Sequence, residues 1–217
     1  MIYPSLSQPG LLLMDMDSTL IQCECIDEIA GFLGIKPKIA AITRRAMEGE
    51  LDFTASLTQR VALLAGLDSR VLQQVYDRCI VLTDGAEELI STLHRHQWRV
   101  GLVSGGFTYF TDRLQVRLGL DFVAANQLEI VDDKLTGQVL GSVVDGAAKR
   151  DHLLAQARAW NIPITQTVAV GDGANDLPML HAAALGVAFH AKPAVRAEAD
   201  ATINSGGLAQ ILSLLDQ

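Results

Sequence analysis

The sequence lacks a long apolar run and an excess of basic residues. No stretch approaches the roughly 18 consecutive apolar residues of a membrane-spanning helix, and residues 1–10 have neither the basic start nor the apolar centre of a secretory signal. The net charge is −8 without any cluster of Lys and Arg, which argues against nucleic acid and anionic membrane surfaces as partners.

Cysteine is also scarce. Cys23, Cys25 and Cys79 are the only three, and a chain of 217 residues needs no disulfide to hold its core. The simplest interpretation of this odd number is reduced thiols in the cytoplasm. A metal site at Cys23 and Cys25 is not favoured, because no second cysteine pair or histidine cluster accompanies them. The apolar fraction of 49% suffices for one large domain, or for one domain with an insertion.

The most informative stretch is Leu-Leu-Leu-Met-Asp-Met-Asp-Ser-Thr at residues 11–19. Four apolar residues lead directly into Asp15, and Asp17 follows two positions later. A continuous apolar run of this kind predicts a strand buried on both faces, as in a parallel sheet. Carboxylates at its carboxyl end lie where open α/β sheets form their ligand crevice. Taken alone, the stretch fits a strand that ends in an ordinary polar turn equally well.

The following region shows helical periodicity and no strand pattern. Apolar residues recur at helical spacing, with Gly and Pro as interruptions, near residues 26–33, 39–46, 53–64 and 71–76. Asp52 is the expected N-cap of the third helix. We predict a helical subdomain at residues 22–84, inserted into a discontinuous core formed by residues 1–21 and 85–217.

From residue 85 onward, strands alternate with helices. The expected strands are residues 99–103, 128–131 and 135–140 (the last two as a hairpin), 167–170, 185–189 and 201–203; the expected helices are 86–94, 107–118, 147–160, 177–184 and 208–215. This alternation implies right-handed βαβ units and a mostly parallel sheet. The predicted fold class is therefore α/β, a Rossmann-like core with an inserted helical cap.

Three of the predicted strands end in polar clusters, which are Asp15 with Asp17, Ser104 with Gly105 and Gly106, and Asp172 with Asn175 and Asp176. In a parallel sheet all three face the same edge, which is harder to attribute to chance than one such cluster. The carboxylates are hard oxygen ligands that suit Mg²⁺. The hydroxyl and unhindered N–H groups after the second strand suit an anion, although a serine there is also a common N-cap.

Four motifs together resemble those of the haloacid dehalogenase superfamily: Asp15-Met-Asp-Ser-Thr19, Val103-Ser-Gly-Gly-Phe107, Lys149 after the hairpin, and Val170-Gly-Asp-Gly-Ala-Asn-Asp176. Their spacing and flanking residues are most similar to the phosphoserine phosphatases. The similarity runs from residue 11 onward and includes the helical insertion. The first and last motifs are highly specific together, whereas the serine and lysine motifs are weak alone.

The resemblance implies Mg²⁺-dependent hydrolysis of O-phospho-L-serine to L-serine and phosphate through an aspartyl-phosphate. It makes Asp15 the nucleophile and Asp17 the general acid and base, with Mg²⁺ bound by Asp15, the Asp17 carbonyl and Asp172. It assigns the phosphoryl oxygens to Ser104, Gly105, Lys149 and Asn175. It also implies that Asp176 supports the metal site and Lys149.

These roles agree with the electrostatics of phosphoryl transfer. A carboxylate that attacks a phosphate dianion meets like-charge repulsion, which one Mg²⁺ and one Lys ammonium offset. Asp17 needs a raised pKa to donate a proton near neutral pH, so we expect its side chain beside the nucleophile and off the metal. Lys149 has an ordinary alternative, because a Lys-Arg pair also fits a solvated helix start.

Substrate identity must come from the insertion. Phe53 and Arg60 are seven residues apart and share a helix face with Leu57, so Arg60 is a guanidinium within an apolar stripe and needs a partner. A substrate carboxylate matches its planar fork. The alternative is an arginine that reaches Glu48 or Glu50.

Glu24 opens the insertion and by itself is an ordinary acid in the first turn of a helix. The family pattern makes it the partner of the substrate ammonium group. Glu24 and Arg60 would then bind a zwitterion such as phosphoserine, between apolar walls formed by Met47 and Phe53.

Two other functions stay open at this point. A phosphotransferase would pass the phosphoryl group to another alcohol, such as homoserine, in place of water. A non-enzymatic phospho-accepting switch would also carry clustered acids and a lysine on a doubly wound sheet, but it has no use for an acid/base at Asp17. We expect a cytoplasmic monomer or homodimer that catalyses the last step of serine biosynthesis.

Overall fold

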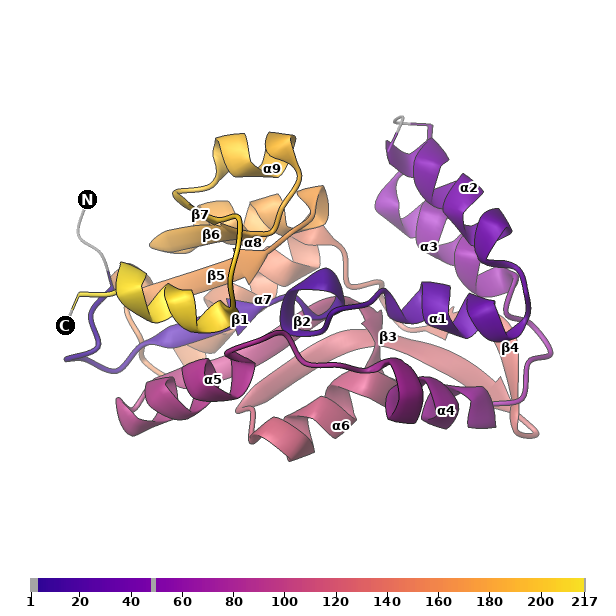
Figure 1. Ribbon diagram of the computed structural model, residues 1–217, viewed down its shortest axis with the longest axis horizontal. Helices are drawn as coiled ribbons and strands as arrows, with labels where there is room; N and C mark the ends of the chain where they lie inside the picture. Colours follow the sequence, from indigo (N-terminus) through magenta and orange to yellow (C-terminus); the bar gives the residue numbers. More distant parts are fainter. Residues whose placement is uncertain (1–3, 48–49, 217) are drawn as a thin grey trace.

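The computed structural model describes residues 4–47 and 50–216 and has a seven-stranded sheet at its centre (Figure 1). The strands are β1 (Leu11–Met14), β2 (Arg99–Phe107), β3 (Phe122–Val131), β4 (Lys134–Leu140), β5 (Thr167–Gly171), β6 (Leu185–Phe189) and β7 (Ala201–Ile203). Their order is β4-β3-β2-β1-β5-β6-β7, and only the β3–β4 pair is antiparallel. The predicted α/β class is confirmed.

Helices cover both faces of the sheet and form a projection at one end. They are α1 (Cys25–Phe32), α2 (Lys36–Met47), α3 (Phe53–Ala62), α4 (Arg70–Cys79), α5 (Ala86–Arg95), α6 (Thr108–Leu118), α7 (Gly146–Ala159), α8 (Leu177–Ala182) and α9 (Pro193–Glu198). α5 and α6 pack on one face, and α7 and α8 on the other. Within the described ranges, no helix is both long enough and apolar enough to cross a bilayer.

β1 is buried on both faces because it lies at the centre of the sheet. Leu12 and Met14 belong to the apolar cluster on the α5–α6 face, and Leu11 and Leu13 to the cluster on the α7–α8 face. Successive side chains of a strand point to opposite faces, so an unbroken apolar run satisfies both clusters. Each such side chain contributes about 1.5–3 kcal/mol when it is buried.

The four helices α1 to α4 follow β1 in the chain, and α2 and α3 project away from the sheet (Figure 1). Asp52 caps α3 as predicted, since its Oδ1 accepts a hydrogen bond from Ala55 N at 2.7 Å. One apolar cluster runs from these helices into the sheet, through side chains such as Ile29 and Leu57. The division at residues 22 and 84 therefore stays a prediction, and we call residues 22–84 the cap.

The β3–β4 hairpin is joined to the cap by backbone hydrogen bonds. Gly66 N donates to Leu135 O at 2.8 Å, and Leu135 N donates to Leu67 O at 2.9 Å. Ser69 N donates to Asp133 O at 2.8 Å. The connection between α3 and α4 is therefore anchored to the hairpin.

Several segments differ from the predicted elements. β2 runs to Phe107 and does not end at residue 103, so Ser104, Gly105 and Gly106 lie within the strand. β3 begins at Phe122 and not at residue 128, because its first part pairs in parallel with β2 before its second part enters the hairpin. The short helix α9 was not predicted. The last segment, Leu208–Leu214, is a 3-10 helix and not the α-helix that its apolar residues indicated.

Candidate active site

The register of the sheet brings the three predicted polar clusters to one edge. Met14 on β1 pairs with Leu102 on β2 and with Val170 on β5, so the residues after these positions lie at the same level. Asp15 N donates to Val170 O at 2.9 Å, which extends the pairing by one residue. The convergence expected from the parallel sheet is therefore present.

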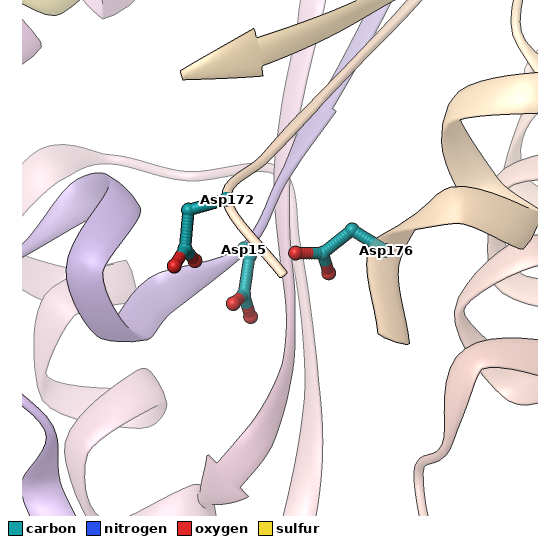
Figure 2. Close-up of side chains that lie close together, drawn as sticks. All are labelled: Asp15, Asp172 and Asp176. Carbon is teal, nitrogen blue, oxygen red and sulfur yellow. The ribbon is translucent and has the colours of Figure 1, made fainter. Parts of the chain in front are cut away.

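Asp15, Asp172 and Asp176 form an acidic cluster at this edge. Each offers a carboxylate oxygen, and these oxygens lie within 4.8 Å of one another. Figure 2 shows the three carboxylates gathered around a common space, with Asp15 at the end of β1 and Asp172 just after β5. Asp15 and Asp172 are close enough to hold one ion, as the sequence predicted.

Lys149 is fully buried between two of these carboxylates. Its Nζ donates to Asp15 Oδ1 at 2.7 Å and to Asp176 Oδ1 at 2.6 Å. Burial alone would lower the pKa of Lys149, but the two carboxylates raise it above its usual value, so the ammonium stays charged. The alternative of a solvated helix start is wrong for Lys149, whereas the neighbouring Arg150 is exposed and pairs with Asp151.

Burial makes the acidic cluster costly to ionise. Desolvation raises the pKa of Asp15 well above its usual range, and the Lys149 ammonium only partly opposes this shift. Desolvation raises the pKa of Asp172 to about 7, and the nearby Asp176 carboxylate adds to the shift. Three carboxylates with one ammonium leave excess negative charge, which a bound cation would neutralise.

The donor set fits a hard divalent cation. All donors in the cluster are oxygens, the preferred ligands of such ions. Asp176 has both carboxylate oxygens engaged, because Oδ1 accepts from Lys149 and Oδ2 accepts from Gly173 N at 3.0 Å. Asp15 and Asp172 are therefore better placed as ligands, with Asp176 as the residue that holds Lys149.

Asp17 lines the same cavity as Asp15 but is not a member of the acidic cluster. Its Oδ1 accepts a hydrogen bond from Cys25 N at 2.8 Å, and a Cβ added to Gly106 would lie 2.6 Å from its Oδ2. Burial raises the pKa of Asp17 to about 7, and the Glu24 carboxylate adds to the shift. A general acid near neutral pH requires such a pKa. The catalytic role itself stays a prediction.

Ser104 and Gly105 lie at the end of β2. Ser104 is fully buried, and its Oγ accepts a hydrogen bond from Gly106 N at 2.8 Å. The N-cap of α6 is Phe107, so Ser104 does not fill that ordinary role. A Cβ added to Gly105 would lie 2.6 Å from the Phe53 ring, which shows that the cap rests on the sheet edge at this point.

A cavity of about 710 Å³ lies between the cap and this edge of the sheet. Of the predicted site residues, those that line it are Asp15, Asp17, Gly105, Asp172 and Asn175 from the core and Glu24, Phe53 and Arg60 from the cap. Ser104, Lys149 and Asp176 are fully buried. Met47 ends α2, and its side chain lies outside the described part of the chain.

Arg60 lines the cavity from α3, and its side chain makes few polar contacts. Its Nε donates to Ser56 O at 3.3 Å, one turn earlier in the same helix. Within residues 4–47 and 50–216 its guanidinium makes no ion pair. Glu50 is not its partner, because it pairs with Arg45 at 2.9 Å. Glu48 lies outside the described residues.

Glu24 stands at the start of α1 and is held by the turn that follows β1. Its Oε1 accepts a hydrogen bond from Ser18 Oγ at 2.7 Å. Ser18 lies in the π-helical turn Met16–Leu20 and has a φ of +57°, a conformation that few residues adopt without a compensating interaction. The turn that carries the catalytic candidates therefore also orients a cap residue.

Three of the cavity residues outside the predicted set bear on its chemistry. Gly106 has no Cβ, and a Cβ at this position would clash with the Asp17 carboxylate. Asp27 comes three residues after Glu24, a helical spacing that is readable in the sequence. Lys192 precedes the short helix α9, which apolar periodicity did not reveal.

Comparison with known proteins agrees with this geometry. Residues 12–181 match the model of the haloacid dehalogenase-like hydrolases. A phosphoserine phosphatase from Idiomarina loihiensis is 53% identical over 208 residues, which are 96% of this chain and 94% of the relative. The chain belongs to the phosphoserine phosphatase family. The resemblance inferred from the four motifs is therefore confirmed, and membership in a family of hydrolases speaks against a non-enzymatic switch.

Other members of the phosphoserine phosphatase family are similar over nearly the whole of this chain. The relative from Vibrio cholerae is 50% identical over 98% of this chain, which spans only 64% of that relative's length. A solved structure described as a phospho-aspartyl intermediate analogue of phosphoserine phosphatase is 42% identical, with a TM-score of 0.91, over 96% of this chain and 100% of its own. A substrate-bound phosphoserine phosphatase complex gives the same identity and TM-score, over 96% of this chain and 99% of its own.

Proposed function

We propose that this protein hydrolyses O-phospho-L-serine to L-serine and phosphate, with Mg²⁺ as its metal and an aspartyl-phosphate on Asp15 as the intermediate. The observation that carries the proposal is one cavity with two chemically different ends. The acidic cluster lies at one end, against the buried Lys149, and Glu24 and Arg60 line it from the cap. Family membership supports the same substrate.

In the first step, a carboxylate oxygen of Asp15 forms a bond to phosphorus as the bond from phosphorus to the serine oxygen breaks. Protonated Asp17 gives its proton to the leaving alkoxide. Lys149 offsets the repulsion between the nucleophile and the phosphate dianion. Asp15, Asp172 and the Asp17 carbonyl would hold Mg²⁺, which would supply positive charge beside the phosphoryl oxygens.

In the second step, a water gives a proton to Asp17 and attacks phosphorus, and the bond between phosphorus and Asp15 breaks. Phosphate leaves, and Asp15 and Asp17 return to their starting forms. Such acid–base catalysis is worth about 10²–10⁴-fold in rate. Ser104, Gly105 and Asn175 bind the phosphoryl oxygens through hydroxyl, backbone N–H and amide groups.

Substrate recognition belongs to the cap. The Arg60 guanidinium lies half-buried in the cavity, so a substrate carboxylate supplies the ionic partner it lacks. Glu24 binds the ammonium group, and Phe53 and Met47 contact the apolar part of the substrate. Phe53 already rests on Gly105, where it shields the reacting phosphorus from bulk water.

Hydrolysis of phosphoserine yields serine, so the reaction is the last step of serine biosynthesis. We place the protein in the cytoplasm, where its three free cysteines would stay reduced. We propose a monomer or a homodimer as the active form.

The test compares phosphoserine, phosphothreonine and an aryl phosphate as substrates, with Mg²⁺ and after chelation. We expect phosphoserine to be preferred and activity to require the added metal. Asp15→Asn should lower turnover at least about 10⁴-fold, whereas Asp112→Asn, at an exposed position on α6, should leave it unchanged. Wild-type rates from Asp15→Asn would exclude this nucleophile. Formation of phosphohomoserine in place of free phosphate, when homoserine is present, would identify a phosphotransferase.

A further inference from the structure

The cavity contains a carboxylate that the proposed function does not use. Asp27 lies in the first turn of α1, where its backbone N–H donates to Glu24 O at 3.0 Å. Like Glu24 and Arg60, it lines the cavity. The side chain is half-buried, and among the described residues its carboxylate has neither a hydrogen bond nor an ion pair. A partly desolvated carboxylate without a partner is unfavourable unless a ligand compensates it.

Asp27 and Arg60 influence each other across the cavity without touching. Burial raises the pKa of Asp27, and the Arg60 guanidinium opposes that shift. Burial lowers the pKa of Arg60, and the carboxylates of Glu24 and Asp27 oppose that shift. The Arg60 guanidinium therefore has the carboxylates of Glu24 and Asp27 nearby, with a further contribution from Asp17, and the Lys36 ammonium also acts on Asp27.

This balance of charge has a consequence for selectivity. Arg60 with Glu24 alone would be a neutral pair, which would tolerate a substrate that carries a carboxylate without an ammonium group. Asp27 adds a second negative charge beside Arg60, in a cavity that Lys192 also lines. An anionic substrate is then repelled unless it also brings a positive charge.

We propose that Asp27 is a specificity-determining residue, which together with Glu24 attracts the substrate ammonium group and repels phosphate monoesters that carry a carboxylate alone. The inference rests on the proposed function and extends it to the choice among phosphate monoesters. An acid at this position also stabilises the N-terminus of α1 through the helix dipole. That role alone would not change the ratio of activities toward two substrates.

Three esters separate these roles. O-phosphoserine carries both charged groups, 3-phosphonooxypropionate has the same skeleton without the ammonium group, and O-phosphoethanolamine lacks the carboxylate. In Asp27→Asn, the preference for phosphoserine over 3-phosphonooxypropionate, measured as a ratio of kcat/KM values, should fall about tenfold. The change should appear mainly in KM. Activity toward phosphoethanolamine should fall with that toward phosphoserine, since both use the ammonium group.

Glu28→Gln is the matched control. Glu28 is the next residue on α1, pairs with Lys36 at 2.9 Å and does not line the cavity. The control removes the same charge and should leave the preference within about twofold, because the Glu28 carboxylate lies outside the cavity and is offset by the Lys36 ammonium. An unchanged preference in Asp27→Asn, or an equal fall in both variants, overturns the proposal.

Two further variants keep the test decisive if Asp27→Asn unfolds more readily. Asp27→Glu should restore most of the preference. Glu24→Gln leaves Asp27 in place and should retain part of the preference, and adding Asp27→Asn to it should remove the remainder. A Glu24→Gln protein without any remaining preference would assign all discrimination to Glu24 and contradict a role for Asp27.

The outcomes also separate this inference from the proposed function. A wild-type protein that hydrolyses none of the three esters, or prefers 3-phosphonooxypropionate, removes the proposed function together with the inference. A wild-type protein that prefers phosphoserine, and whose Asp27→Asn variant keeps the same preference, removes only the role of Asp27.

Discussion

The core and the cap contribute different kinds of charged side chains to one cavity. In the core, Lys149 is fully buried and donates hydrogen bonds of 2.7 and 2.6 Å to Asp15 and Asp176. In the cap, the one hydrogen bond that the Arg60 side chain makes among the described residues is to the carbonyl of Ser56 in its own helix, at 3.3 Å. Among the described residues, Lys149 is therefore paired with carboxylates before substrate arrives, whereas Arg60 has no ionic partner.

This difference corresponds to two separate tasks. Stabilising charge that develops in a transition state needs groups that are already oriented, because reorientation during the reaction costs energy. Recognition of a substrate gains from groups whose partners arrive with it, since the new contacts then favour closure of the cap. Substitutions in the core should therefore affect folding and chemistry together, and those in the cap should affect binding.

The largest effect is expected from Lys149→Met. Loss of the ammonium leaves Asp15 and Asp176 buried without a positive partner, so the free energy of unfolding should fall by about 3–5 kcal/mol. Phosphoserine turnover should fall about 10³-fold or more. Urea denaturation after chelation and release of phosphate measure the two effects.

Arg150→Met provides the comparison for that variant. Arg150 is exposed and pairs with Asp151 at the surface, so its loss should change stability by less than about 1 kcal/mol. If Lys149→Met had the same free energy of unfolding as Arg150→Met, the Lys149 ammonium would not be needed to stabilise the buried carboxylates of Asp15 and Asp176.

Asp17→Asn should lower kcat for phosphoserine by about 10²–10⁴-fold. An aryl phosphate with an acidic leaving group needs no proton in the first step, so this variant should release aryl alcohol in a burst and then stall. In the proposed mechanism Asp17 acts first as an acid, and because its pKa is raised to about 7, the active form would dominate below that pH. Wild-type kcat/KM for phosphoserine should therefore fall as pH rises above about 7.

The aryl phosphate supplies the internal control for the pH dependence. Its rate of aryl alcohol release in the first turnover should not show the same decline. Equal declines for both esters would point to titration of a different group.

The smallest effect on folding, with a clear effect on binding, is expected from Arg60→Ala. KM for phosphoserine should rise about 10- to 100-fold, because a charge-assisted bond to the substrate carboxylate is lost. The free energy of unfolding should be nearly unchanged, since within residues 4–47 and 50–216 the Arg60 side chain makes one hydrogen bond, inside its own helix. The aryl phosphate should be unaffected.

Arg44→Ala, at an exposed position on α2, is the matched control and should alter neither quantity. A large loss of stability in Arg60→Ala would erase the contrast between cap and core.

The sequence predicted the core of the site well because its signals are local. An unbroken apolar run followed by carboxylates marks both β1 and β5, and parallel pairing then brings Asp15 and Asp172 together without further information. The burial of Lys149 could not be predicted from the sequence, because a Lys-Arg pair has the same local pattern whether its side chains are solvated or buried. Its position depends on where α7 packs.

The missed elements depend on tertiary contacts. The first part of β3 becomes a strand by pairing with β2, and α9 is too short for apolar periodicity to distinguish it from a loop. Asp27 resembles any acid in the first turn of a helix until the cavity is seen beside it. In the cap, the spacing of residues in the sequence predicted which of them share a helix face. It could not predict the contact between Phe53 and Gly105, which depends on how the cap packs against the sheet.

The attachment of the hairpin to the cap limits the ways in which substrate can enter. Ile21 and Leu82 form a bridge where the chain enters and leaves the cap. A second attachment comes from the hydrogen bonds of Gly66 N to Leu135 O and of Leu135 N to Leu67 O. A body held at two separate places turns about the line that joins them. We therefore expect movement of the cap to be smallest beside the hairpin, where these hydrogen bonds hold it.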